Sequence, residues 1–291
     1  MQVWEIILDA FLDTLMVFPF LVVIYILIEF LEHRTTFTKN HKILQGNLAP
    51  LIGSATGLIP QCGFSVMAAK LYDKGLIRTG TLLAVLIATS DEAFIILLSS
   101  GSAAAAIMPI VVIKLIVGVA VGYLVNFLYT AEKLSETEFE DIHAYSCGRE
   151  HEGHSDVKVY LINPLLHSLT IAFYLLIVNL VFGFVISAVG EEQIASSMIG
   201  GPYFQPFITS LIGLIPNCAS SAIITGTYIH GGITFGSCIA GLCANAGLGL
   251  VVLFRNTKKI KRNIVFALTL YLISVAVGVA VNSIAVAAGI I

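Results

Sequence analysis

Two nearly identical hexapeptides decide the fold of this chain: GLIPQC at residues 57–62 and GLIPNC at residues 213–218. They lie 156 residues apart, and the same offset pairs many further residues without a gap. Examples of these pairs are Ser65 with Ser221, Tyr72 with Tyr228, Gly75 with Gly231, Gly80 with Gly236, and Asn126 with Asn282. The offset predicts that the chain consists of two copies of one structural unit.

The composition is that of an integral membrane protein. Of the 291 residues, 57% are hydrophobic and 11% are charged, whereas a soluble domain carries about 25% charged residues. Five apolar runs are long enough for a helix of about 20 residues across a bilayer: 15–31, 82–98, 106–128, 165–189 and 264–288. The first run lacks the basic leader of a signal peptide and is expected to remain in the protein. The net charge of −3 does not favour nucleic-acid binding.

The distribution of basic residues predicts the topology. Basic residues flank the first hexapeptide at 33–42 and 70–78, and in the second copy they gather at 255–262. The 156 offset pairs this last cluster with 99–106, so the basic residues have changed ends between the copies. Because basic loops stay in the cytoplasm, the second unit is expected to be inverted.

The predicted fold class is therefore an all-α integral membrane protein with two inverted-topology repeats. Each repeat is expected to contain transmembrane helices and a helical hairpin broken at its proline. The predicted organisation is a first repeat at 1–130, a polar cytoplasmic linker at 131–160 and a second repeat at 161–291. Both termini are expected outside, in a multi-pass protein of the cell's inner (plasma) membrane.

The first apolar segment and both hexapeptides carry a resemblance to a known family. The stretch DTLMVFPF at residues 13–20, which leads into EFLEHR at 29–34, resembles the ten-transmembrane-helix heavy-metal exporter family of bacteria. The similarity covers nearly the whole chain. Family members carry names such as arsenic efflux protein or manganese transporter. The resemblance implies a membrane transporter with ten helices and gives no settled map of functional residues.

The two hexapeptides predict the binding site, because a broken membrane helix exposes backbone groups that cargo can satisfy. The expected substrate-binding residues are Pro60, Gln61, Cys62 and Ser65 in the first copy, and Pro216, Asn217, Cys218, Ser220, Ser221 and Asn245 in the second. The thiols of Cys62 and Cys218 suit a soft metal or metalloid. Buried cysteines also serve simply as packing residues, and the amides and hydroxyls equally suit helix capping.

Asp91 and Glu92 lie in the middle of an apolar span, where an acidic residue costs about 2.5–3.5 kcal/mol on insertion scales. Lys114 lies at a similar depth in the next span and is expected to pair with one acid. Asp91, Glu92 and Lys114 are thus the expected coupling residues, and the two acids join Cys62 and Cys218 as candidate metal ligands. The alternative is a structural ion pair between helices.

The linker holds a second, weaker candidate metal site. Its residues are His143, Cys147, His151 and His154, whose spacing puts the first three on one face of a helix. Solvated polar side chains in a loop are the alternative interpretation, and Gly148 and Gly153 disfavour a helix.

The sequence thus predicts a secondary transporter and not an enzyme, with no cofactor. It is expected to export a metal ion or metalloid, an arsenic species or manganese, by proton-coupled alternating access. A transmembrane thiol–disulfide electron carrier using Cys62 and Cys218, or an organic-anion transporter, are the alternatives. The expected partners are the transported metal, metalloid or small anion and the lipid bilayer, without nucleic acid, and a homo-oligomer is compatible with the sequence. No Gly-x-x-x-x-Gly-Lys-Ser/Thr loop is present, which argues against ATP coupling.

Overall fold

The architecture is helical throughout the residues that the computed structural model describes. These residues are 4, 6–8, 10–12, 14–15, 18–19, 22–23, 26, 46, 48–59, 62–73, 75–89, 93–101, 104–128, 163–198, 200–255 and 259–289. The main helices are α4 (Ala49–Gly57), α5 (Cys62–Asp73), α6 (Thr79–Ala88), α7 (Ala93–Ser99), α8 (Ile107–Leu128), α10 (Asn163–Val189), α11 (Glu191–Ser197), α12 (Gln205–Gly213), α13 (Cys218–Ile229), α14 (Phe235–Ala244), α15 (Leu248–Arg255) and α16 (Ile260–Ala287). No strand occurs in these ranges, in agreement with the predicted all-α class.

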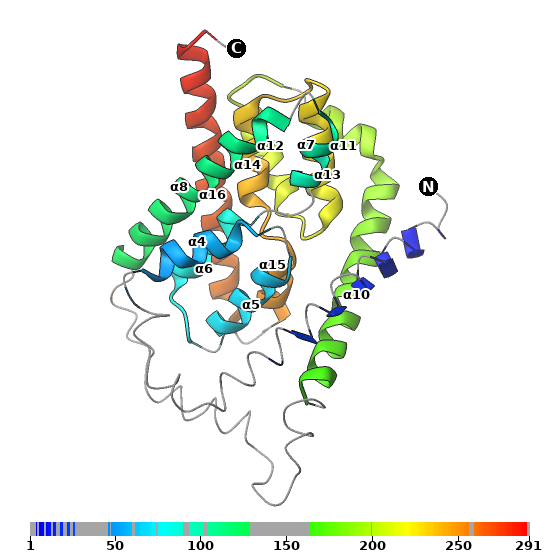
Figure 1. Ribbon diagram of the computed structural model, residues 1–291. Coiled ribbons are helices and arrows are strands. Elements are labelled where there is room, and N and C mark those ends of the chain that lie inside the picture. The colour runs from blue at the N-terminus through cyan, green and yellow to red at the C-terminus, as the bar shows by residue number, and fades with distance from the viewer. Residues whose placement is uncertain are drawn as a thin grey trace, which may run out of the picture.

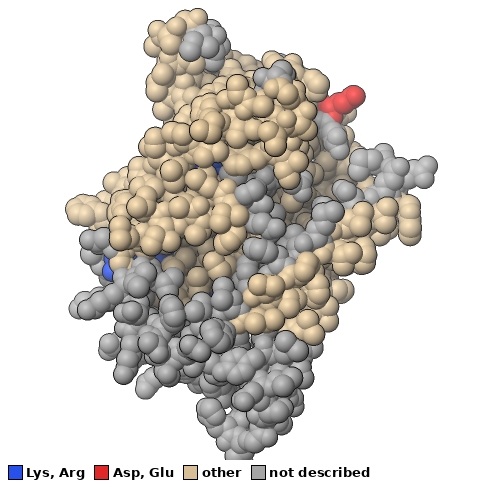
Figure 2. All heavy atoms as spheres, in the orientation of Figure 1, with Lys and Arg blue, Asp and Glu red and all other residues tan. Residues whose placement is uncertain are grey.

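Five segments of the described chain are long and apolar enough to cross a membrane: Thr79–Ser99, Ala104–Leu128, Ser168–Val189, Phe235–Arg255 and Ile260–Ala287. Two of them form the interior. An apolar stretch of 18 residues is 73% buried in Thr79–Ser99 and 94% buried in Phe235–Arg255. The other three are mostly exposed, with 17–28% buried. An exposed apolar helix is stable only in lipid. On the face shown in Figure 2, the described residues accordingly include very few charged side chains.

The helices recur in the same register. The bounds of α4, α5 and α6 fall exactly 156 residues before those of α12, α13 and α14. α4 and α12 each begin with a proline in the first turn, where the missing N–H costs nothing. α5 and α13 are each followed by a glycine with positive φ, Gly75 (70°) and Gly231 (74°), the usual conformation after a helix C-terminus.

Close backbone contacts hold two groups of helices together, α4 with α6 in the first half of the chain and α12 with α14 in the second. A Cβ on Gly57 of α4 would fall on the carbonyl oxygen of Val85 in α6. At the corresponding place, a Cβ on Gly213 of α12 would fall on the carbonyl oxygen of Gly241 in α14. Glycine is therefore required at both crossings, since any side chain would separate the two backbones.

α8 and α16 cover these two groups and run in opposite directions (Figure 1). α8 descends in this view along the chain, whereas α16 rises toward the C-terminus. α8 packs against α4 and α6, and α16 packs against α12 and α14. α10 and the N-terminal segment lie together on the other side of the molecule.

Candidate functional site

The second hexapeptide forms the connection between α12 and α13. α12 ends at Gly213, and Asn217 caps the N-terminus of α13, because its Oδ1 accepts a hydrogen bond from Ala219 N at 2.9 Å. Asn217 is 7% exposed, and Cys218 is half-buried. The capping role that the sequence left open for Asn217 is therefore present in the structure.

The two serines of this connection bond to the backbone around the break. Ser220 Oγ donates to the carbonyl oxygens of Ile215 (3.0 Å) and Asn217 (2.7 Å). Ser221 Oγ donates to the carbonyl oxygen of Cys218 at 2.8 Å. Both serines are buried. They therefore stabilise the first turn of α13 and the non-helical residues before it, a role consistent with local capping.

The first hexapeptide falls between α4 and α5. α5 begins at Cys62, and Ser65 in its first turn is completely buried. Pro60, Gln61 and the side chain of Cys62 lie outside the described residues, as do Asp91, Glu92 and the linker residues His143, Cys147, His151 and His154. The predicted roles of these residues stay predictions. Among the residues that the structure does describe, no group of three or more His, Cys, Asp or Glu side chains is placed to hold a metal ion.

Both central spans are interrupted, which the sequence did not predict. α6 ends at Ala88, and Thr89 has a non-helical ψ of 127° before α7 begins at Ala93. The other central span is interrupted after Ala244, where Asn245 has a ψ of 92°. Asn245 is the residue that the 156 offset pairs with Thr89.

The second interruption has its own internal support. Asn245 Oδ1 accepts a hydrogen bond from Gly247 N at 3.0 Å, and Gly247 has a φ of 52°. Asn245 is 3% exposed. Asparagine commonly bonds to its own backbone two residues on and favours a turn there. The side chain of Asn245, predicted to bind cargo, thus also shapes the break between α14 and α15.

The helix that begins at each hexapeptide crosses the short helix that follows the break in the other half of the chain. α5 packs against α15, and α13 packs against α7. A Cβ on Gly249 of α15 would lie 2.7 Å from the carbonyl oxygen of Ser65 in α5. The first turn of α5, which begins at Cys62, therefore lies directly against the first turn of α15. These crossings bring the hexapeptides close to the helix breaks.

Lys114 joins the two breaks. This residue is in α8 and is only 2% exposed. Its Nζ donates to the carbonyl oxygen of Thr89, and to that of Leu242 at 3.0 Å. The sequence predicted an acidic partner, Asp91 or Glu92, both of which lie outside the described residues; the two carbonyl partners were not predicted. They are among the carbonyl groups that a helix end leaves without an intrahelical partner.

Two further cysteines, Cys238 and Cys243, lie in α14 and are fully buried. The sequence assigned them no role.

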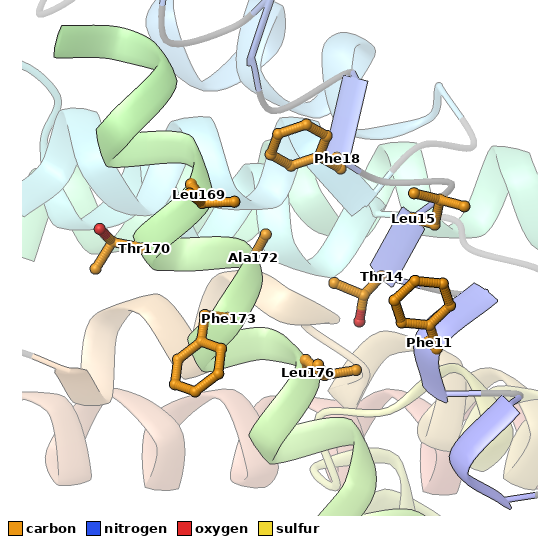
Figure 3. A pocket seen from close by; sticks show the side chains of 9 residues that line it. All are labelled: Phe11, Thr14, Leu15, Phe18, Leu169, Thr170, Ala172, Phe173 and Leu176. Atoms are coloured by element: carbon orange, nitrogen blue, oxygen red, sulfur yellow. The ribbon is translucent and has the colours of Figure 1, made fainter. Parts of the chain in front are cut away.

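An apolar groove of about 620 Å³ lies away from this site, between the N-terminal segment and α10. Figure 3 shows that Phe11, Leu15 and Phe18 face residues of α10 such as Leu169 and Leu176 across it. The described residues that line the groove carry no charge.

Interrupted central spans, a buried lysine and lipid-exposed outer helices define the class: a multi-pass α-helical membrane protein. The model of one family, described as "Putative, 10TM heavy-metal exporter", matches residues 2–187. The match covers more than half of the chain, so the protein belongs to this family, as its resemblance predicted. No curated protein and no solved structure matches the chain.

Proposed function

We propose that the protein is a secondary transporter that exports a metal ion or metalloid by alternating access. The observation that carries this proposal is the position of Lys114, whose ammonium bonds to the ends of two interrupted helices in the core. Interrupted helices that meet around charged groups at mid-membrane are typical of secondary transporters. Membership of a family described as heavy-metal exporters supports the cargo class.

The two halves, 1–130 and 161–291, act in this proposal as inverted repeats joined by a cytoplasmic linker at 131–160. Three observations support the inversion: the common 156-residue offset of the helix bounds, the opposite directions of α8 and α16 (Figure 1), and the exchange of basic residues between ends. An odd number of crossings in each unit produces such an arrangement. The linker then lies in the cytoplasm of a cell whose inner (plasma) membrane holds the protein, with both termini outside.

Cargo binds between the two proline-broken hairpins in this proposal. The ligands are the thiols of Cys62 and Cys218, with Gln61, Asn217 and Asn245 lining the site. The partial exposure of Cys218 supports this assignment, because a ligand must reach the thiol. Two thiols select arsenite or a soft metal, whereas coordination by Asp91 and Glu92 selects manganese.

Coupling in this proposal is the task of Asp91, Glu92 and Lys114. One of the two acids gives up its proton in exchange for cargo. The ammonium of Lys114 offsets the negative charge of the acids within the membrane. Lys114 contacts the carbonyl of Thr89, two residues before Asp91. The carbonyl group that accepts this hydrogen bond is therefore only two residues from Asp91 in the chain, one of the acids that the ammonium is proposed to balance.

Transport into inside-out vesicles tests the proposal. Purified protein is reconstituted, and uptake of arsenite, Zn²⁺, Mn²⁺ and an organic anion is measured with and without an imposed pH gradient. We expect uptake of one metal or metalloid that falls at least about tenfold when the gradient is collapsed, and a similar loss in D91N. C62S and C218S abolish uptake of a thiophilic cargo but not of Mn²⁺.

C147S is the comparison, because Cys147 belongs to the weaker candidate metal site in the linker and not to a hexapeptide. If cargo binds at the hexapeptides, uptake by C147S should equal that of the wild type. Transport of the organic anion alone, or transport that ignores both the pH gradient and D91N, contradicts the proposal.

A further inference from the structure

Lys114 is the one described charge buried at the centre of the helical core, and the repeat does not require it. The corresponding residue in α16 is Leu270, which is fully buried. Two equivalent places in the same architecture therefore hold an ammonium and an isobutyl group. Burying a cation in a membrane is costly, so a residue that adds only packing would not be a lysine.

The ammonium lies at two helix C-termini. Thr89 is the residue immediately after α6, and Leu242 belongs to the last turn of α14, which ends at Ala244. Their carbonyl oxygens accept the hydrogen bonds of Lys114 Nζ. The last four carbonyl groups of a helix have no N–H partner within it, and they carry the negative end of the helix dipole. The two ends therefore present oxygen atoms to a single positive charge.

We propose that the Lys114 ammonium is a tethered cation, which occupies a site that would otherwise bind a small monovalent cation such as Na⁺, K⁺ or NH₄⁺. Half-helix C-termini and unwound carbonyls are the ligands that bind Na⁺ in other transporter architectures, and carbonyl oxygens replace the hydration shell of alkali ions.

The tether has a consequence for movement between the halves. Thr89 and Leu242 belong to different halves of the chain, so one ammonium links α8 and α6 of the first half to α14 of the second. A free ion could leave when the halves separate, whereas the lysine remains attached to α8. The protein therefore needs no Na⁺ or K⁺ to hold these helix ends together. This inference does not depend on which cargo the protein carries.

Removal of the tether tests the inference. Wild type, K114A, K114M and L270A are purified in detergent, and thermal unfolding is followed in NaCl, KCl, NH₄Cl or choline chloride at equal ionic strength. K114A opens a space beside the two carbonyl oxygens. We expect at least one of the small cations to raise its Tm saturably over that in choline, by about 3 °C or more.

The other proteins should not respond. The wild type already holds its own ammonium, and the thioether of K114M fills the space without adding a charge. L270A is the matched control, because it also removes a buried side chain at the equivalent place in α16 but opens no space beside Lys114. For each of these three proteins, the Tm should be the same in all four salts.

Two results overturn the inference. One is a K114A protein with the same Tm in all four salts, and the other is an equal salt response in K114M or L270A. If K114A folds in none of the salts while K114M folds, no external ion replaces the ammonium, and the inference fails as well. Since the readout is unfolding, failure of the transport assays leaves this test intact.

Discussion

The Asn126 side chain in α8 accepts a hydrogen bond from the backbone N–H of Gly80 in α6, with 3.0 Å between Oδ1 and N. The same bond recurs 156 residues later, where Asn282 Oδ1 in α16 accepts from Gly236 N in α14 at 3.1 Å. Gly236 lies in the first turn of α14, whose N–H groups have no intrahelical acceptor. Each asparagine therefore joins a long outer helix to the start of a central span.

Asn282 is expected to contribute more to stability than Asn126. Asn282 is fully buried, and its Nδ2 also donates to Pro202 O and to Ser237 Oγ. N282A leaves the buried N–H of Gly236 without its acceptor and should lower the free energy of unfolding by about 1–3 kcal/mol. N126A should cost less, because that side chain is only half-buried. Urea unfolding in mixed micelles measures both.

The exposed Ser283, next to Asn282 in α16, provides the control, since S283A removes only a bond within the helix. S283A should change the free energy of unfolding by less than about 0.5 kcal/mol. An N282A protein as stable as S283A would contradict the predicted role of the asparagine.

A second prediction concerns the crossing of α12 and α14. The Cβ of G213A would overlap the backbone carbonyl of Gly241, which cannot rotate away. We expect the helices to separate and the free energy of unfolding to fall by about 1–3 kcal/mol. G226A in α13 is the matched comparison, because a Cβ there meets no atom within 4 Å. G226A should instead stabilise the helix by about 0.5–1 kcal/mol, and equal Tm shifts for both would refute the explanation.

The sequence predicted the helical membrane class and the family, because both depend on strong signals. Long apolar runs and the repeated hexapeptides can be recognised in the sequence whichever residue begins or ends each helix. The helix breaks at Thr89 and Asn245 were not predicted, since each lies within a run that is apolar enough to form one continuous helix. Gly247 was the available signal for the second break, but glycine is also common in closely packed membrane helices.

The partners of Lys114 could not be predicted for a related reason. The sequence suggests pairing with an acid at similar depth, and it says nothing about backbone carbonyls until a helix is known to end. The carbonyls of Thr89 and Leu242 become available only through the breaks and come together only through the packing of α6, α8 and α14. By contrast, the hexapeptide itself indicates that a helix ends there, and α12 does end at Gly213, four residues before Asn217. The predicted role of Asn217 in substrate binding stays a prediction.

A third prediction separates capping from cargo binding at Asn217. N217A removes the acceptor for Ala219 N and should destabilise the protein by about 0.5–2 kcal/mol, whereas serine is an equally good cap. N217S should therefore keep the Tm of the wild type. If the amide also binds cargo, both variants lose transport, and only N217A loses stability. Normal transport by N217S would restrict Asn217 to capping.

A fourth prediction concerns the contact of α5 with α16. Arg262 Nη2 lies 3.6 Å from Asp73 Oδ1, and its guanidinium stacks on the Tyr72 ring at 4.6 Å. The Arg262 and Asp73 side chains are 33% and 26% exposed, so their coupling in a double-mutant cycle should be only about 0.2–1 kcal/mol. R262K should lose more stability than the ion pair explains, because an ammonium lacks the planar face that stacks on tyrosine. Unfolding of Y72L and Y72L/R262K checks this, since the arginine-to-lysine difference should disappear without the ring.

The final prediction uses thiol accessibility to test the cargo site. In a C62S/C147S background the remaining cysteines are Cys218, Cys238 and Cys243. Cys218 is half-buried, whereas the other two are completely buried in α14. A maleimide should therefore add once, at Cys218, within the time in which the native fold persists. Mass spectrometry of peptides locates the adduct, and C218S in the same background should give none. Arsenite protection is measured in C147S, which keeps both hexapeptide thiols. If these thiols hold a thiophilic cargo, arsenite should slow the labelling of Cys218 at least about tenfold, whereas Mn²⁺ should not. Arsenite protection that persists when Asn217 and Asn245 are both changed to alanine would mean that the thiols alone bind the metalloid, without the amides proposed to line the site.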